Sequence, residues 1–380
     1  MKRAISRMVV VCGTAVCLLA CGDGTEPPAG PGSAPAPGLT DGEWLAGDLH
    51  VHSEHSDDSS LNPVARITAL AQSAGMDYLA LTDHDNHVDG VIATWDDPDY
   101  RSEQMILLYG SEFTTAKGHA NTLSATRYDH RALYALRDAG GPALAARADE
   151  LGVHLSANHP TNSDPWLFGY DGIVDSLEVW NALYAFPSDN RANLDLWDSL
   201  MEAGLRMPAR GGSDCHHQQG NQPLGLNIGT PTTWVYAAER SAEAVIEAIA
   251  RGRASISYAP GAERLILDAD TDGAGTFETL MGDNAVATGE SVRFRVRIDG
   301  FRALAGYTLD IVHNGAVVDT LRPSAPETFF TYAPEPGARH YYRVELNGST
   351  PEAETLPAQA IGFYGRKVAL SNPVHFGFAD

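Results

Sequence analysis

The sequence predicts an α/β domain followed by an all-β domain, on the basis of three observations. Between about residues 44 and 259, apolar strand-like runs alternate with amphipathic, Ala-rich stretches. This alternation indicates a parallel barrel or a doubly wound sheet. After about Gly261 only strand-like runs follow, separated by Gly, Pro and Asn turns, which is typical of a β-sandwich. His, Asp and Glu residues also recur at or just after the ends of the strand-like runs of the first part.

The elements of the two parts are predicted from these patterns. In the first part we expect strands over residues 47–52, 78–81, 105–108, 120–124, 154–157, 176–179, 206–209 and 232–236. Helices are expected over residues 63–74, 131–139, 142–151, 190–203 and 241–251. In the second part we expect strands over residues 291–298, 307–313, 328–332 and 340–346. The predicted domains are therefore residues 44–261 and 262–380.

The N-terminus predicts export and a lipid anchor. Lys2, Arg3 and Arg7 precede an apolar run, residues 8–20, that is too short to span a bilayer as a permanent helix. The run ends in Leu-Leu-Ala-Cys21, which resembles a bacterial lipobox, so residues 1–20 are expected to be removed and Cys21 to be lipidated. The alternative is an ordinary signal peptide that happens to end in Cys.

Residues 21–43 are rich in Gly, Pro and Ala and suit a flexible tether. Gly22 rather than Asp follows the predicted lipidation site, which favours the outer membrane, on its periplasmic or surface face. The membrane is then contacted through the lipid anchor only.

Charge and cysteine content exclude several classes of protein. The chain has 49 acidic and 26 basic residues, a formal net charge of −23. Such a protein is not expected to bind nucleic acid or anionic lipid over a broad surface, although a small anionic substrate can be held by metal ions. Of the four cysteines only Cys215 remains unmodified in the predicted mature protein, which excludes an internal disulfide.

The first two strand ends carry candidate metal ligands. In the segment Gly-Asp-Leu-His50-Val-His52 polar and apolar residues alternate, so the two imidazoles are expected to lie on one face of a strand. Asp57 lies in the loop that follows and can curl back over them. The run 78–81 leads into Thr-Asp83-His84-Asp85, where we expect His84 to be a ligand and one of the flanking aspartates to orient it.

Further candidates follow the later strands. Glu112 ends the third run and can bridge two cations through its two oxygens, and His119 begins the next strand. His159 ends the run that starts at His154, and we expect His154 itself to be structural. Asp-x-His spacing then recurs after a Gly-Gly pair, while Cys215 is expected to turn away from the site. The predicted ligands are His50, His52, Asp57, His84, Glu112, His119, His159, Asp214 and His216.

These motifs resemble the PHP (polymerase and histidinol phosphatase) metallohydrolase superfamily over residues 44 to about 260. The Gly-His119-Ala-Asn step, the β-rich tail and the Ala-Leu-Ser-Asn-Pro373 ending are most similar to its CehA/McbA-like branch. The resemblance implies a distorted (β/α)7 barrel, here followed by an all-β, Ig-like sandwich. It also implies two or three divalent ions, Zn, Mn or Fe.

The resemblance further implies which residues share an ion. One ion would take His50, His52 and Asp214 and be bridged by Glu112 to a second. The second would be held by His119 and His159. A third would be held by Asp57, His84 and His216.

A metal-dependent hydrolase is the predicted function, with three hypotheses open. A phosphoesterase using a metal-bridged hydroxide is favoured over a hydrolase of carbamates, amides or carboxylic esters. A non-catalytic, metal-stabilised surface binding protein is the third. Besides Glu112 and Asp214, the candidate catalytic residues are Lys117, Arg210 and His217, which lie beside ligands in the sequence and can hold an anion or protonate a leaving group.

Overall fold

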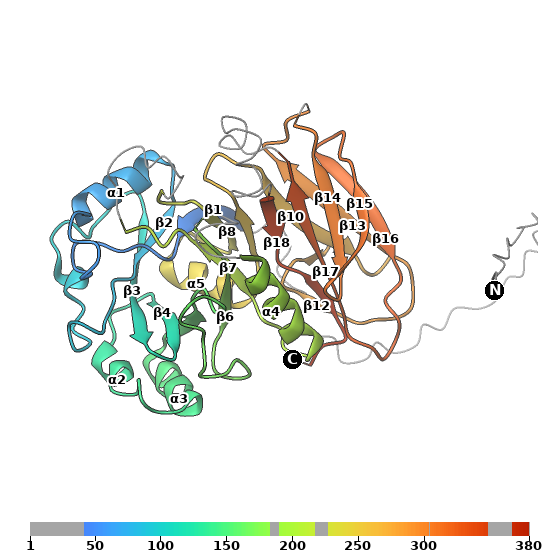
Figure 1. Cartoon of the computed structure of the whole chain (residues 1–380). Coiled ribbons are helices and arrows are strands. Elements are labelled where there is room, and N and C mark those ends of the chain that lie inside the picture. Colours follow the sequence, from blue (N-terminus) through green and yellow to red (C-terminus); the bar gives the residue numbers. More distant parts are fainter. Residues whose placement is uncertain (1–41, 183–189, 217–226, 304, 349–366, 380) are drawn as a thin grey trace, which may run out of the picture. The chain divides into compact units, whose positions relative to one another are not determined.

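The computed structural model describes residues 42–182, 190–216, 227–303, 305–348 and 367–379 (Figure 1). The predicted signal peptide, Cys21, residues 21–41 of the predicted tether and His217 lie outside these residues, whereas Glu43, the last residue of the predicted tether, begins strand β1 (Glu43–Asp48). Within the described ranges, no helix combines the length and apolar character needed to cross a membrane.

The first part of the chain has mixed α/β structure, as predicted. The fully buried strand β2 (Tyr78–Leu81) and strand β5 (His154–Ala157) have the predicted bounds. In helix α1 (Val64–Ser73) the buried residues Val64, Ile67 and Ala71 form one apolar face. The remaining elements are β1 (Glu43–Asp48), η1 (Ala93–Asp96), β3 (Ile106–Thr115), β4 (Gly118–Ser124), α2 (His130–Tyr134), α3 (Gly141–Leu151), β6 (Ser176–Asn181), α4 (Asn190–Glu202), β7 (Ala209–Gly212), β8 (Thr232–Ala237), α5 (Ala242–Ala250) and β9 (Ala254–Ser257).

Two parallel blocks of strands are joined by an antiparallel hairpin. Strands β1, β2 and β3 are parallel, and so are β5, β6 and β7. Strand β4 is antiparallel to both β3 and β5. The chain reverses between β3 and β4 in a tight turn that ends at Gly118, where φ is 103°. Strand β8 is antiparallel to β1. The parallel order predicted from the alternation therefore holds within each block and is interrupted between them.

The segment after β7 pairs with the segment after β1. Val51 and Cys215 form a parallel bridge, and the amide of His52 donates to the carbonyl of Cys215 at 3.0 Å. The amide of Asp214 donates to the carbonyl of His50 at 2.8 Å. These contacts bring the first and last predicted ligands of the sequence to the same place.

Every element described after α5 is a strand (Figure 1). Strands β10, β11, β13 and β16 form a four-stranded sheet, and the others belong to the large sheet. Apolar side chains of both sheets, including Phe294 and Tyr342, share one buried cluster. The strands are β10 (Arg264–Asp270), β11 (Thr279–Leu280), β12 (Asn284–Ala285), β13 (Val292–Asp299), β14 (Thr308–His313), β15 (Ala316–Leu321), β16 (Glu327–Tyr332), β17 (His340–Asn347), β18 (Lys367–Ser371) and β19 (Val374–Phe376).

The large sheet continues from the first part of the chain into the second. Strand β18 is antiparallel to β9, with Leu370 opposite Ile256. The backbone of β9 therefore pairs on one side with β8 and on the other with a strand near the end of the chain. The barrel, the Ig-like sandwich and the boundary at residues 261 and 262 stay predictions.

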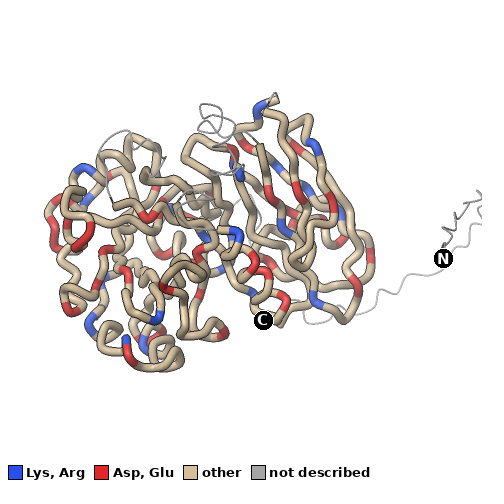
Figure 2. The backbone as a smooth tube through the Cα atoms, in the orientation of Figure 1, with Lys and Arg blue, Asp and Glu red and all other residues tan. Residues whose placement is uncertain are grey.

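Charged residues of both signs occur throughout the described chain, and Figure 2 shows Lys and Arg interspersed among Asp and Glu along the backbone.

One buried network joins α4 to the C-terminal strands. Arg343 is 2% exposed and donates to both carboxylate oxygens of Asp198, at 3.1 and 2.7 Å, and to Glu345, which also pairs with Lys367.

The substitution Arg343→Met is expected to destabilise the protein by about 3–5 kcal/mol, because it leaves the buried carboxylate of Asp198 without its cation and Glu345 with Lys367 alone. Urea unfolding of the purified protein would measure the change. Arg251→Met, which removes an exposed pair with Glu247, is the control and should cost less than about 1 kcal/mol. Equal effects of the two substitutions would contradict the assigned role of the network.

Candidate metal centre

Eight of the nine predicted ligands gather at one place. Six of them follow the end of a strand, whereas Glu112 lies within β3 and His119 near the start of β4. His50 and His52 come just after β1, and the Val51 bridge keeps their alternation beyond the end of the strand. His84 follows β2 and His159 follows β5. In the β3–β4 hairpin Glu112 lies opposite Asn121, and His119 lies opposite Thr114. Asp214 and His216 follow β7.

Glu112 lies at the centre of this group. Its Oε1 atom is 3.3 Å from Nε2 of His50, 3.2 Å from Nδ1 of His119 and 3.4 Å from Nε2 of His159. Its Oε2 atom is 2.9 Å from Nδ1 of His84 and 3.5 Å from Nε2 of His52. The two oxygens of one buried carboxylate thus face two different sets of imidazoles, which is the arrangement of a bridging ligand.

Several of these atoms are buried and make no hydrogen bond within the described chain. They are Nε2 of His50, Nε2 of His52 and Oε2 of Glu112. An unsatisfied buried polar group costs about 1–3 kcal/mol, so three together are expensive unless another partner is present. Imidazole nitrogens and carboxylate oxygens are the donors that Zn, Mn and Fe accept, so the residues fit a metal centre.

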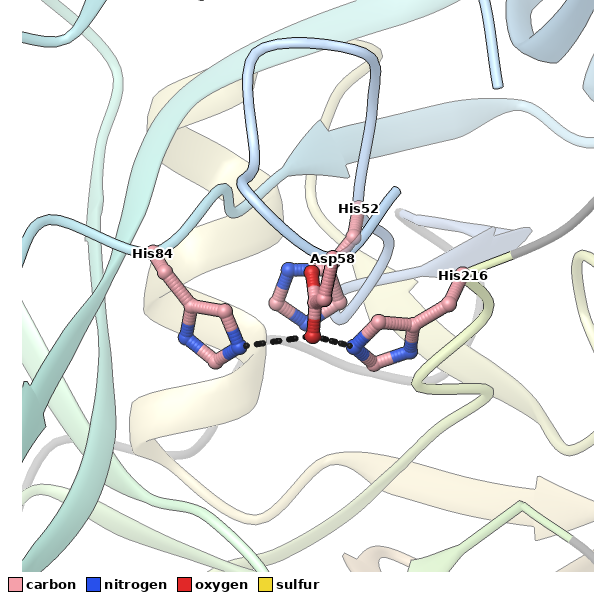
Figure 3. Close-up of side chains that lie close together, drawn as sticks. All are labelled: His52, Asp58, His84 and His216. Atoms are coloured by element: carbon pink, nitrogen blue, oxygen red, sulfur yellow. Dashed lines mark ion pairs between the residues drawn. The ribbon is translucent and has the colours of Figure 1, made fainter. Parts of the chain in front are cut away.

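A second group of ligands lies beside the first. His52, Asp58, His84 and His216 each offer an atom within 4.8 Å of the others. Oδ2 of Asp58 is 3.4 Å from Nε2 of His84 and 2.8 Å from Nε2 of His216 (Figure 3). Figure 3 shows this oxygen pointing between the two rings, with His52 behind it. His52 also forms a group with His50 and Asp214, so these two groups share His52 as a possible ligand.

The acidic residue of this second group is Asp58, whereas the sequence analysis predicted Asp57. The Asp57 side chain is 56% exposed, and its Oδ1 atom lies 3.8 Å from Nδ1 of His87. The reason is the loop geometry: the amide of Ser56 donates to Ser53 and that of Ser59 to Ser56, so the chain turns twice around this position. Hydroxyls of Ser56 and Ser59 donate to Oδ1 of Asp58 at 3.0 and 3.2 Å, which leaves Oδ2 directed at the imidazoles.

The two aspartates beside His84 have other partners than that ring. Asp83 accepts from the amide and hydroxyl of Ser53, and Asp85 pairs with His130 at 2.9 Å. The hydroxyl of Thr114 lies 2.7 Å from Nδ1 of His84, the same nitrogen that faces Oε2 of Glu112. The predicted orienting role of the flanking aspartates is therefore corrected.

Behind the ligands lies a layer of buried polar residues that the sequence analysis did not identify. Oε1 of Glu178 is 3.0 Å from Nδ1 of His50, and its Oε2 accepts from the amide of His159 at 2.9 Å. The amide nitrogen of Asn158 donates to Oε1 of Glu112 at 2.7 Å. A carboxylate on Nδ1 fixes the tautomer that turns the lone pair of Nε2 toward a metal.

Arg210, a predicted candidate for holding an anion or protonating a leaving group, belongs to this layer, outside the residues that line the cavity. It is fully buried, donates to Glu178 at 2.7 Å and to the hydroxyl of Ser156 at 2.7 Å, and also contacts Asn158. The positive charge of its guanidinium compensates the negative charge of the buried Glu178 carboxylate. Lys117 is also placed elsewhere: its ammonium lies 3.3 and 3.4 Å from the carbonyls of Asp138 and Ala139.

His154, predicted to be structural, is buried with its Nε2 2.8 Å from the hydroxyl of Ser176. Cys215 is buried in an apolar cluster with Val51 and Leu81. Both side chains lie outside the groups of possible ligands found among the described residues.

The electrostatics of the site act in opposite directions on its candidate ligands. Glu112 and Asp58 raise the pKa of His84 to about 11 against the effect of burial, whereas the carboxylates and His52 are shifted the other way. Burial alone would raise the pKa of Glu112, but His50, His84 and His119 hold it well below its usual range. The pKa of Asp214 is also held well below its usual range, mainly by His50 and His52, against the effect of burial. Burial and the neighbouring His216 lower the pKa of His52 to about 4, so this ring is neutral at pH 7. Ionised carboxylates and a neutral imidazole are the forms that bind metal.

The ligands open into a cavity of about 600 Å³. Its walls combine the metal-binding side chains with a polar segment, residues 161–164, and with Asn181 and Ala192. Among the described residues that line it there is no Lys or Arg. A substrate anion in this cavity would therefore have to be neutralised by metal ions.

The comparisons with known proteins concern the same region. Residues 48–144 match the PHP domain. The matched PHP region contains the predicted ligands His50, His52, Asp57, His84, Glu112 and His119, and also Asp58. It does not reach His159, Asp214 or His216. No protein of curated function matches the chain.

Three solved structures are similar in part. A two-domain protein of Bacteroides vulgatus, which contains a predicted PHP-like metal-dependent phosphoesterase, is 17% identical, with 88% of this chain and 97% of the other covered and a TM-score of 0.43. A protein of Bifidobacterium adolescentis, which its name assigns as a metal-dependent phosphoesterase, is 18% identical over 48% of this chain and 91% of its own, with a TM-score of 0.33. An amidohydrolase of Chromobacterium violaceum is 16% identical over 47% of this chain and 89% of its own, with a TM-score of 0.29.

The substitution Glu178→Gln is expected to lower metal affinity by about 10–100-fold, because it removes the charge that orients His50. Competition with a chelator, followed by metal analysis, would measure the affinity. Glu263→Gln is the control, since this buried carboxylate pairs with Arg302, in the β-rich part of the chain, at 2.6 Å. Unchanged affinity in Glu178→Gln would show that His50 needs no carboxylate partner.

Proposed function

We propose that the protein is a metal-dependent hydrolase that cleaves phosphoesters with a metal-activated water as nucleophile. The observation that carries the proposal is Glu112, whose two buried oxygens face separate sets of imidazoles within 3.5 Å. A carboxylate in this position suits two neighbouring cations. Such cations, when bound, lower the pKa of a shared water and polarise the scissile bond.

The groups of ligands support two or three ions of Zn, Mn or Fe. Glu112 would join the group that contains His50 and His159 to the group that contains His84 and His119. Asp214 would hold an ion together with His50 and His52, and Asp58 would complete a further site with His84 and His216. The mixed nitrogen and oxygen donors do not separate the three metals.

The protein's own residues would position the reacting groups. Glu178 and Asn158 hold His50 and Glu112 from behind, so the ligands are oriented before substrate enters. The polar wall at residues 161–164 can hydrogen-bond the leaving group, and Asp164 in it disfavours a second negative charge there. A phosphodiester, with one charge at the reacting phosphorus, fits this wall better than a substrate with an additional anionic group.

A hydrolase of carbamates, amides or carboxylic esters is the second candidate, and one observation favours it. The described lining of the cavity has no Lys or Arg, so an uncharged substrate is also accommodated. The resemblance to the CehA/McbA-like branch, named for a carbamate hydrolase, points in the same direction.

The test is metal content combined with turnover of three chromogenic substrates by the purified mature protein. They are bis-p-nitrophenyl phosphate, p-nitrophenyl phosphate and a naphthyl carbamate. Two or three ions with turnover of a phosphate ester is the expected result. Turnover of the carbamate alone would replace the proposal with the second candidate. Bound metal without any turnover would favour a non-catalytic surface protein.

We also propose that the protein is anchored outside the cytoplasm through a lipid on Cys21. The Leu-Leu-Ala-Cys21 sequence and the Gly- and Pro-rich stretch after it support an outer-membrane lipoprotein with a tether. The variant Cys21→Ala is expected to move the protein from the membrane fraction to the soluble fraction with its activity intact. A variant that still sediments with membranes would contradict the lipid anchor.

A further inference from the structure

A second cluster of carboxylates lies in the all-β part of the chain, in the hairpin between β10 and β11. Asp270 ends β10, and Asp272 and Glu278 lie in the loop that leads to β11. Each of the three offers an oxygen within 4.8 Å of the others. This group contains no histidine or cysteine, unlike the metal centre.

The loop backbone holds one oxygen of each carboxylate. The amide of Gly275 donates to Oδ2 of Asp270 at 3.0 Å, and that of Ala274 to Oδ1 of Asp272 at 2.8 Å. The amide of Thr271 donates to Oε1 of Glu278 at 2.8 Å. These hydrogen bonds hold in place three carboxylates whose oxygens lie within 4.8 Å of one another.

The second oxygen of Asp270 is the independent sign of a missing partner. Asp270 is 8% exposed, and its Oδ1 is buried with no hydrogen-bond partner among the described residues. The neighbouring arginines do not supply one. Arg293, opposite Asp270 in the register, lies over the ring of Phe329 at 4.3 Å. Arg295 is engaged by both oxygens of Asp268 at 2.9 and 2.8 Å.

We propose that Asp270, Asp272 and Glu278 bind a calcium ion. An all-oxygen set of carboxylates suits a hard cation, whereas Zn and Fe favour sites with nitrogen or sulfur. Ca²⁺ tolerates six to eight ligands in irregular geometry and accepts water for the remainder. Asp272 and Glu278 are exposed, so water can complete the shell. The proposal is independent of the proposed hydrolase function.

The site would stabilise the hairpin that it closes. Strand β11 has only two residues, Thr279 and Leu280, and their pairing with β10 depends on the position of the loop. Three carboxylates, two of them exposed, predict affinity in the range of extracellular calcium modules, with Kd on the order of 10⁻⁴–10⁻³ M.

The test is calorimetric titration of CaCl₂, and separately MgCl₂, into the mature protein loaded with its metal-centre ions. We expect one saturable Ca²⁺ site that is selective over Mg²⁺, and a Ca²⁺-dependent rise in Tm. Asp272→Asn and Glu278→Gln are expected to weaken Ca²⁺ binding by at least about tenfold, and Asp270→Asn to abolish it. Asp319→Asn, which changes an exposed aspartate of β15, is the matched control and should bind Ca²⁺ like the unmodified protein.

Three results would overturn the proposal. They are no saturable Ca²⁺ binding by the unmodified protein, unchanged binding in Asp272→Asn and Glu278→Gln, or loss of Ca²⁺ binding in Glu112→Gln with retention in the loop variants. Because Asp272 and Glu278 are exposed, their variants decide the question even when Asp270→Asn fails to fold. Circular dichroism of each variant identifies such a failure.

Discussion

Replacing Glu112 by Gln is expected to abolish turnover and to remove at least one metal ion per molecule. The amide has only one acceptor oxygen and no charge, so it cannot serve both sets of imidazoles that the carboxylate faces. We expect kcat to fall by roughly 10³-fold or more, in line with the loss of a central electrostatic group. Metal analysis and steady-state kinetics on the same preparation would measure both changes, and Asp214→Ala is expected to behave in the same way.

The control for this experiment is His154→Gln. His154 is buried like the ligands but contacts Ser176 instead of the metal centre. Its replacement should leave metal content unchanged. An active Glu112→Gln enzyme, or loss of an ion from His154→Gln, would show that the centre is misplaced.

Asp58→Asn is expected to lower activity by roughly 10²-fold and to deplete the ion held with His84 and His216. The adjacent substitution Asp57→Asn should change neither, because that side chain is directed away from the rings. Both variants carry the same chemical change one residue apart, so effects on folding or net charge are matched. Metal content and kcat of the pair would decide between the two positions. A larger effect at Asp57 would restore the ligand predicted from the sequence.

Strand ends were the most informative signal in the sequence. Histidines and acids just after apolar runs predicted where the chain places its candidate ligands, because consecutive parallel strands present their carboxyl ends at one edge of a sheet. The position of an acid inside a loop was not predictable in this way. Asp57 and Asp58 are chemically identical, and only the serine turns around them select Asp58.

The residues behind the ligands were missed for a related reason. Glu178 lies inside a strand rather than at its end, in the run Ser-Leu-Glu-Val-Trp-Asn, where it reads as one polar residue of a buried strand. A fully buried carboxylate needs a partner, and Arg210 has the same position in the neighbouring strand, with which Glu178 is in register. Both residues can be read from the sequence, but their position opposite each other in neighbouring strands cannot.

The β-rich part was predicted in class but incompletely in its elements. Runs with period-two alternation, such as Val292–Asp299, were identified, because every second residue is buried. Strand β15 is mostly exposed, and β18 is buried throughout, so neither alternates. Their pairing partners define them as strands, and such long-range pairing is not a local property of the sequence.

The pairing of β18 with β9 has a consequence for how the molecule is made. Lys367–Ser371 supply the backbone partner of Ala254–Ser257, which lie far from them in the sequence. Through β8, Ala254–Ser257 connect to β1, the strand that leads into the candidate ligands His50 and His52. Pairing over such a long sequence separation is slow to form. For a chain that crosses a membrane before it folds, as the proposed lipid anchor requires, this delay is useful. In such a chain the large sheet would be completed only after export, and the candidate metal centre would take up its ions at the destination.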